Sequence, residues 1–402
     1  MKKKMHLPPP IKSTIRTLND AGYEAYIVGG AVRCWLLGTE IHDYDITTSA
    51  TPEEIKQVFA DHKTIDTGIR HGTVTVLEKK TPIEITSYRT ESHYTDHRHP
   101  DSVSFTRSLE EDCARRDFTI NALCYHPQEG IRDFFGGVQD LQNFLIRAVG
   151  DPNQRFEEDA LRILRSIRFA AQLGFSIEEN TRRAIHEKLP SLSYVSQERI
   201  TAELIKTVGA PYFKSILQEY QPLFLQLIPE LKEYPESRWS GTYMNISRSP
   251  SDSCVRMALL LDGLNDSARS DEILRRLRYS NNDRYALVNL LETKNLPLAT
   301  KIEMRKALNR LKVPSAQFFD FRCARDTRLD RAQLDALYKE IVQNNDCYTF
   351  KQLEVTGRDL KSLDLKGPQI SAAMNSCLTA VMEERVPNEK EALLQYLKEL
   401  HS

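Results

Sequence analysis

The pattern of apolar and polar positions changes once along the chain. Before about residue 150, short apolar runs at 26–28, 73–77 and 83–88 have the length and alternation of strands, and short helical patterns lie among them. After Pro190 the apolar positions keep a helical spacing to the end of the sequence. The pattern therefore predicts an α+β first part, followed by a part made of helices.

Two glycines and two aspartates follow the first predicted strand. Gly29 and Gly30 come directly after the run at 26–28, and Asp43 and Asp45 are separated by one residue. A strand through the two aspartates would place both carboxylates on one face, where they repel each other unless a cation binds. Mg²⁺ takes oxygen ligands, and a Gly-Gly turn exposes backbone N–H groups that suit a triphosphate. This pattern predicts nucleotidyl transfer, with a solvated acidic strand end as the alternative.

Three further polar features of the first part add chemistry. Glu84 alternates with the apolar positions of its strand, and beside an acidic pair on a neighbouring strand it would be the natural third carboxylate. Arg116 suits a phosphate and Asp117 a ribose hydroxyl, although a surface ion pair would explain both. The polar, histidine-rich stretch 91–107 is either a functional loop or a disordered insertion.

A second informative pattern is the helix predicted over 157–171. Leu164 and Ile167 lie on its apolar stripe, whereas Asp159 and Arg162 fall together on another face. An intrahelical ion pair is the simple interpretation. The functional interpretation is that a carboxylate accepts from the exocyclic amine of cytosine or adenine while a guanidinium donates to the adjacent ring nitrogen. Uracil and guanine present the opposite pattern, so such a pair would reject them.

Composition limits the class of protein. The chain has 402 residues, enough for several domains, and a formal net charge of −1, so a nucleic acid would have to meet a local basic surface. The basic residues between 271 and 312 are a candidate, with a solvated face as the alternative. Seven cysteines without a Cys-x-x-Cys pair favour a reducing compartment, and no stretch is apolar enough to span a membrane. We expect a soluble, cytoplasmic protein.

The motifs occur in an order that resembles one family. That order is Gly-Gly-Ala-Val-Arg at 29–33 with the two aspartates, Arg-Arg-Asp-Phe-Thr-Ile-Asn-Ala at 115–122, Glu-Asp-x-x-Arg at 158–162 and Glu-Arg-Ile at 198–200. Together they resemble the class II tRNA nucleotidyltransferases, the CCA-adding enzymes. The ends of the bacterial members are also similar to the motifs at 356–360 and 386–394. The resemblance therefore extends over nearly the whole chain.

The resemblance implies a fold and a reaction. The fold would be a nucleotidyltransferase head with a small mixed sheet over 1–150, a helical neck with the nucleotide-selecting helix over 151–210, a helical body over 211–300 and a tRNA-binding helical tail over 301–402. The reaction would be the template-independent addition of C, C and A to the 3′ end of tRNA from CTP and ATP, with release of pyrophosphate. We expect no membrane partner, and the sequence leaves a homodimer open.

The resemblance also assigns roles by position in the motifs. Asp43 and Asp45 would hold Mg²⁺, and Glu84 would complete the catalytic carboxylates. The expected nucleotide-binding residues are Gly29, Gly30 and Arg33 at the triphosphate, Arg116 and Asp117 at the ribose and phosphate, and Asp159 and Arg162 at the base, with Arg165 and Arg168 in support. The stretch 91–107 matches the flexible loop that the family uses when it changes from C to A addition.

The chain departs from the family pattern at one position, and other functions share some of its motifs. The family usually carries Asp where this chain has Cys34, which bears on nucleotide affinity. A bacterial poly(A) polymerase shares the head, but the segment 67–76 and the tail resemble the CCA-adding type. A CC-adding enzyme would lack the loop, whereas an A-adding enzyme shares the core motifs and stays open. Retention of Asp43 and Asp45 argues against a non-catalytic RNA-binding scaffold.

Overall fold

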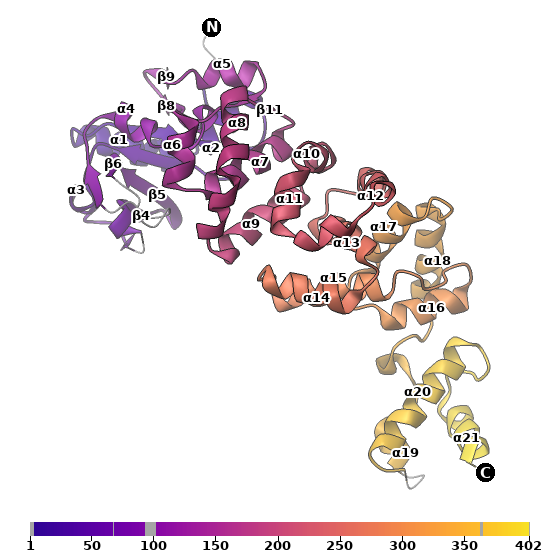
Figure 1. The fold of residues 1–402 in the computed structure, drawn as a ribbon. Coiled ribbons are helices and arrows are strands. Elements are labelled where there is room, and N and C mark those ends of the chain that lie inside the picture. Colours follow the sequence, from indigo (N-terminus) through magenta and orange to yellow (C-terminus); the bar gives the residue numbers. More distant parts are fainter. Residues whose placement is uncertain (1–3, 67, 93–101, 362–364, 402) are drawn as a thin grey trace. The chain divides into compact units, whose positions relative to one another are not determined.

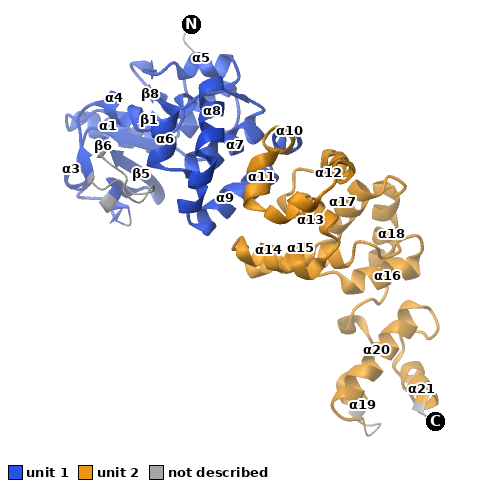
Figure 2. Cartoon of the chain, viewed as in Figure 1, with its two compact units in different colours: residues 1–216 blue, residues 217–402 orange. Residues whose placement is uncertain are grey.

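The chain forms two compact units, residues 1–216 and residues 217–402 (Figure 2). The computed structural model describes residues 4–66, 68–92, 102–361 and 365–401. Within these ranges, no helix combines the length and the apolar content that crossing a bilayer requires. The finer division into head, neck, body and tail stays a prediction.

Unit 1 contains the sheet and the helices that surround it (Figure 1). Its strands are β1 Ala25–Val28, β2 Asp45–Thr48, β3 Thr64–Ile65, β4 Thr73–Glu78, β5 Thr81–Ser87, β6 Arg89–Ser92, β7 Ser102–Phe105, β8 Cys124–His126, β9 Gly130–Arg132, β10 Leu145–Ile146 and β11 Ser176–Ile177. Its helices are α1 Pro9–Asp20, α2 Gly30–Leu37, α3 Pro52–Val58, α4 Leu109–Ala114, α5 Gly137–Gln142, α6 Pro152–Glu158, α7 Leu161–Leu173, α8 Glu179–Lys188 and α9 Gln197–Val208.

Seven strands form one mixed sheet in the order β3-β4-β5-β2-β1-β8-β9. β2 runs parallel to β5, with Ile46 opposite Ile85, and antiparallel to β1, with Val28 opposite Asp45. Burial alternates along β4 and β5, as the sequence pattern predicts, whereas all four residues of β1 are buried. The register places the start of β2 beside both the end of β1 and the middle of β5. The predicted α+β fold with a mixed sheet is confirmed.

Local sequence signals explain several element ends. Thr51 and Glu54 form a reciprocal capping box at the start of α3, with Pro52 at its first position. Gly38 ends α2 in the left-handed conformation, with a φ of 70°. The two-residue turn between β4 and β5 is made by Lys79 and Lys80, both at positive φ.

The predicted helix over 157–171 is interrupted, so this prediction was wrong in one respect. α6 ends at Glu158, Asp159 is extended with φ −145° and ψ 102°, and α7 begins at Leu161. The Asp159 carboxylate accepts a hydrogen bond of 3.1 Å from the Leu161 backbone N–H. An aspartate that bonds its own backbone in this way competes with the helical conformation, which explains the break.

Two other predicted elements differ in extent. The strand predicted through both aspartates begins only at Asp45, so Asp43 precedes it. Part of the stretch 91–107 belongs to the hairpin of β6 and β7, in which Arg89 pairs with Phe105. The remainder of the predicted loop, residues 93–101 with its histidines, lies outside the described residues.

Unit 2 is helical throughout its described residues (Figure 1). Following α10 Phe213–Glu219, which crosses the boundary, the helices are α11 Gln221–Leu227, α12 Glu236–Arg248, α13 Ser253–Leu261, α14 Ser267–Arg276, α15 Asn281–Glu292, α16 Lys301–Arg310, α17 Ser315–Arg325, α18 Arg331–Gln343, α19 Gly357–Lys361, α20 Pro368–Met382 and α21 Lys390–His401. The last helices enclose their own apolar cluster, which includes Leu360, Cys377 and Leu393.

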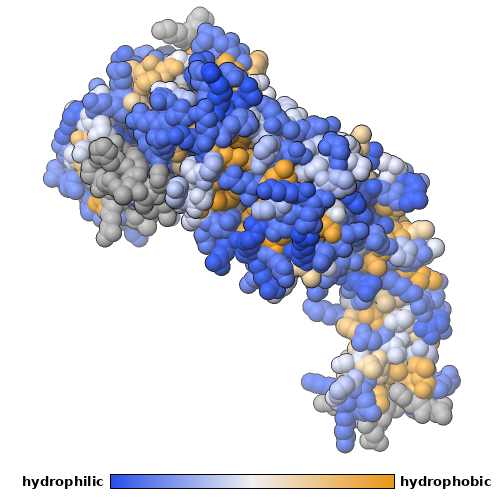
Figure 3. All heavy atoms as spheres, in the orientation of Figure 1, coloured by the Kyte–Doolittle hydropathy of each residue, from blue (hydrophilic) through white to orange (hydrophobic). Residues whose placement is uncertain are grey.

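The basic stretch 271–312 is engaged in ion pairs within unit 2. Arg275 and Arg284 both pair with Asp271, at 2.7 and 2.6 Å. Lys306 pairs with Glu383 at 2.6 Å. Hydrophilic residues of both units cover much of the face shown in Figure 3. These pairs favour the solvated-face interpretation for the side chains that take part in them.

Candidate active site

The candidate catalytic carboxylates gather where β2 begins. Asp45 is the first residue of β2, and the parallel register places it beside Glu84 on β5. Asp43 precedes the strand by two residues, and all three side chains are exposed. Partial desolvation raises the pKa of Asp45, and repulsion from Glu84 and Asp43 adds to this effect while Arg116 opposes it. The structure thus brings the three predicted carboxylates into one electrostatic neighbourhood.

This donor set suits a hard divalent cation. Across the described ranges, no group of three or more His, Cys, Asp or Glu side chains is arranged to hold a metal by itself. Carboxylate oxygens from Asp43 and Asp45 would provide only part of an octahedral shell. Mg²⁺ fills its remaining coordination positions with water and substrate phosphates, so a site with only two or three protein carboxylates suits it. A cation bound there would also relieve the repulsion between Asp45 and the carboxylates of Glu84 and Asp43.

The predicted triphosphate residues surround the turn after β1. Gly29 has a φ of 69°, a conformation that glycine adopts readily, and its N–H donates to the Leu123 carbonyl at 3.0 Å. Gly30 begins α2, whose N-terminal N–H groups favour anions. The Arg33 guanidinium donates to Asn121 and lies 4.9 Å from the centre of the Phe169 ring. Its Nη2 would be 3.9 Å from a Cβ placed on Gly30, so the guanidinium lies beside the turn.

Arg116 and Asp117 have different local partners. Arg116 donates to Asp112 at 3.0 Å, and its Nε is also buried without a partner. Asp117 accepts from Arg165 Nη2 at 2.5 Å and from the Asn121 amide at 3.0 Å. Burial would raise the pKa of Asp117, but Arg165 and the hydrogen bond from Asn121 outweigh it and hold the pKa at about 2. Asp117 is therefore ionised and fixed at neutral pH.

Asp159 and Arg162 lie at the break between α6 and α7, and each has another partner in the structure. Asp159 accepts from Arg199 Nη2 at 2.8 Å and from Arg199 Nη1 at 3.2 Å. Arg162 donates to Glu158 at 2.6 Å and to the Arg115 carbonyl at 3.0 Å. The simple intrahelical pair between Asp159 and Arg162 is thus replaced by two separate pairs. Their role in selecting the base stays a prediction.

The supporting arginines of α7 are anchored through an aromatic ring that sequence reasoning did not identify. Phe169 lies 5.5 Å from the guanidinium of Arg165, 4.0 Å from that of Arg168 and 4.9 Å from that of Arg33. Arg168 also pairs with the buried Glu203 on α9 at 2.5 Å. One ring therefore joins Arg33 on α2 to Arg165 and Arg168 on α7.

Comparison with known proteins identifies the family. The chain is 38% identical over 404 residues to the CCA-adding enzyme of Lactobacillus helveticus, a match that covers 96% of each protein. The chain belongs to the CCA-adding enzymes. It is therefore a nucleotidyltransferase, as the motifs predicted. The CCA-adding enzyme of Pediococcus pentosaceus is similar at 35% identity over 97% of both chains.

Family models and solved structures agree with the assignment of this chain to the CCA-adding enzymes. Residues 25–147 match the family "Poly A polymerase head domain", residues 174–234 match "Probable RNA and SrmB-binding site of polymerase A", and residues 249–397 match "tRNA nucleotidyltransferase domain 2 putative". The Bacillus stearothermophilus CCA-adding enzyme in complex with CTP superimposes with a TM-score of 0.81, at 32% identity over 98% of both chains. The Thermotoga maritima CCA-adding enzyme complexed with tRNA shares the fold, with a TM-score of 0.65 at 20% identity. Nucleotidyltransferases of this kind use divalent metal ions.

Sequence reasoning missed four residues that contact the predicted site residues, although two of the four lie in motifs that it had singled out. Asn121 and Arg199 belong to motifs that carried the family resemblance, so their place in the site was open to prediction. Asp112 and Phe169 had no such signal, because their importance depends on partners from several elements.

Proposed function

We propose that this enzyme adds C, C and A in turn to the 3′ end of tRNA, from CTP and ATP, in the presence of Mg²⁺. In each step the terminal 3′ oxygen bonds to the α-phosphorus of the nucleotide, the bond from that phosphorus to the bridging α–β oxygen breaks, and pyrophosphate leaves. The 3′ hydroxyl gives up its proton to solvent. The carboxylates at the start of β2, together with the Gly29 turn and the guanidinium groups of Arg33 and Arg116 beside that turn, carry the proposal.

The chain's own residues would position the nucleotide. Asp43 and Asp45 would hold Mg²⁺, which when bound neutralises charge on the triphosphate, and Glu84 completes the carboxylate set. The N–H groups at Gly30 and the guanidinium of Arg33 would bind the phosphates. Their positions are set before substrate arrives, because Arg33 is already held by Asn121 and Phe169. Such preorganisation lowers the cost of binding the transition state.

Base selection would use the break between α6 and α7. Asp159 Oδ1 accepts from Arg199 and from the Leu161 N–H, whereas Oδ2 accepts from Arg199 and has a second lone pair that can accept from the exocyclic amine of cytosine or adenine. Arg162 would donate to the neighbouring ring nitrogen. Uracil and guanine present a carbonyl to the carboxylate and an N–H to the guanidinium, so buried partners would stay unpaired. Arg165 and Arg168 would keep the selecting groups in place through Phe169.

The test is an extension assay with purified protein and Mg²⁺. Three tRNA substrates would end before CCA, after the two C residues, or after the complete CCA, with CTP and ATP supplied singly and together. We expect the shortest substrate to grow by three nucleotides and then stop. Extension of the CC-ended substrate alone would identify an A-adding enzyme. Long A tails would identify a poly(A) polymerase. Tight tRNA binding without extension would point to a scaffold.

Two finer expectations belong to the same proposal. The enzyme would act in the cytoplasm, which fractionation of cells with an antibody against the chain tests. Self-association into a homodimer stays a prediction, and sedimentation equilibrium at enzyme concentrations above and below those of the assay would decide it.

A further inference from the structure

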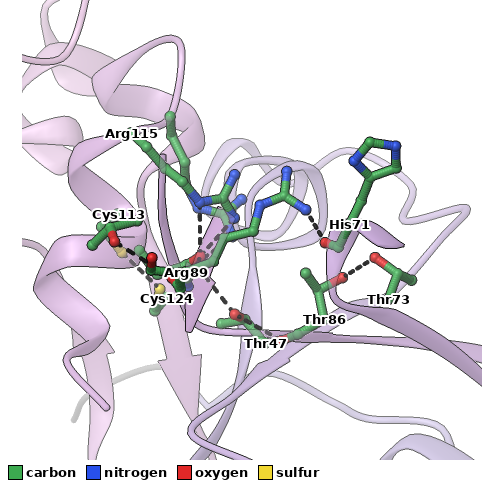
Figure 4. Close-up of polar contacts among 12 residues, drawn as sticks. Thr47, His71, Thr73, Thr86, Arg89, Cys113, Arg115 and Cys124 are labelled. Atoms are coloured by element: carbon green, nitrogen blue, oxygen red, sulfur yellow. Dashed lines mark hydrogen bonds and ion pairs between the residues drawn. The ribbon is translucent and has the colours of Figure 1, made fainter. Parts of the chain in front are cut away.

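Asp112 is a buried carboxylate that has no part in the proposed mechanism. It lies on α4 with an exposed fraction of 0%. Its oxygens accept from Arg115 Nη2 at 2.5 Å, from Arg116 Nη2 at 3.0 Å and from the hydroxyl of Thr47 at 3.2 Å. The backbone N–H of Arg89 is 3.4 Å away. Figure 4 shows Thr47, Arg89 and Arg115 in this region, with the Arg89 guanidinium directed at His71.

The carboxylate is charged in the folded protein. Burial alone would raise the pKa of Asp112, but Arg116 and Arg115 outweigh burial and lower it. An ionised carboxylate deprived of water is tolerated only where cations and hydrogen-bond donors replace the lost hydration. Asp112 therefore fixes the guanidinium groups that surround it.

The contacts of Asp112 lead to the active site. Thr47 lies two residues after Asp45 on β2. Arg116 acts electrostatically on Asp45, and its Nη1 would be 3.8 Å from a Cβ placed on Gly29. Asp112 accepts from the Nη2 of Arg116, whereas the Nη1 lies on the side of the Gly29 turn. A guanidinium held in this way presents Nη1 to the glycine turn.

We propose that Asp112 is a positioning residue that orients Arg116 toward the phosphates and ribose of the incoming nucleotide. The inference rests on the proposed function, because it takes the nucleotide to lie beside Asp45 and Gly29. Its hydrogen bonds to Thr47 and to the start of β6 hold α4 in register with β2. Asp112 contacts no part of the nucleotide itself.

A double-mutant cycle tests this role. CTP binding in the presence of Mg²⁺ would be measured by calorimetry, without tRNA, for the wild type, Asp112→Asn, Arg116→Met and the double variant. Loss of a charge-assisted contact predicts a rise of about tenfold in the CTP dissociation constant for Asp112→Asn. Because Asp112 acts through Arg116, the double variant should bind CTP as Arg116→Met does. Glu110→Gln, an exposed change on the same helix, should bind as the wild type does.

The cycle remains informative if Asp112→Asn folds poorly. The double variant removes one negative and one positive charge together, so it should melt closer to the wild type than Asp112→Asn does. A second readout is selectivity, because KM for CTP and ATP should rise together while the preference for CTP over UTP stays unchanged. A double variant that binds CTP more than threefold more weakly than Arg116→Met would overturn the inference. So would wild-type CTP binding by Asp112→Asn. A wild type that binds CTP but extends no tRNA would instead refute the proposed function.

Discussion

The ion pair between Asp117 and Arg165 predicts how the stability of unit 1 depends on pH. The pKa of Asp117 falls from its ordinary value of 3.8 to about 2 in the folded state. A depressed acid pKa stabilises the fold above the unfolded-state value, and that contribution disappears as the pH falls through the folded-state value. At 1.36 kcal/mol for each pH unit, the contribution at neutral pH is about 2 kcal/mol. We expect Asp117→Asn to remove this contribution.

For a unit of this size, a loss of about 2 kcal/mol corresponds to a fall in Tm of about 4–8 °C at pH 7. Roughly half of the contribution remains at pH 3, so the Tm difference between the wild type and Asp117→Asn should shrink as the pH is lowered. The chain has two tryptophans, Trp35 in unit 1 and Trp239 in unit 2, so a Trp239→Phe background lets fluorescence report unit 1 alone. Thermal melts in that background measure both quantities.

A matched control is Asp61→Asn, because Asp61 is also in unit 1 but is exposed. It should change Tm by less than about 2 °C, since surface substitutions are usually within 0.5 kcal/mol. A fall of less than 2 °C for Asp117→Asn at pH 7, or an equal fall at pH 7 and pH 3, would refute the reasoning about this ion pair.

Three further predictions concern the active site. Asp45→Asn should lower kcat more than about a hundredfold while raising the Tm of the metal-free protein at neutral pH, because an acid with a raised pKa destabilises the fold when ionised. Asp159→Ala should reduce the preference for CTP over UTP by about tenfold or more with little change in metal affinity, measured by single-nucleotide incorporation and metal titration. Cys34→Asp should alter KM for CTP by less than about threefold in steady-state assays, since Asn121 and Phe169 already orient Arg33. Contrary outcomes would be a lower metal-free Tm for Asp45→Asn, an equal loss with all four nucleotides for Asp159→Ala, or a Cys34→Asp variant that rescues a grossly deficient wild type.

Features set by neighbouring residues were open to prediction from the sequence. The capping box at Thr51, the end of α2 at Gly38 and the alternation in β5 all depend on residues a few positions apart, and the alternation predicted around Glu84 is confirmed. The break at Asp159 depends on a competition between helix formation and a local hydrogen bond. Helical periodicity carries no information about that competition, so the prediction of one continuous helix failed there.

The partners of the site residues were harder to predict, because they come from distant positions. Asp159 and Arg199 are 40 residues apart, and Asp117 and Arg165 are 48 residues apart. No periodic pattern relates residues at such separations. Ordered family motifs indicated which residues gather, but only the fold shows that Asp112 connects Arg116 with β2.

The break between α6 and α7 has a consequence for how substrate preference evolves. α6 packs on α8, whereas α7 packs on α9, so the two sides of Asp159 are supported by different neighbours. The distance between the carboxylate and the guanidinium of Arg162 is therefore a property of helix packing as well as of two side chains. Because we propose that Asp159 and Arg162 select the base, we expect substitutions in α8 or α9 to change nucleotide choice without contacting a nucleotide. Directed evolution toward a new nucleotide should accordingly collect changes in these helices as well as at the site.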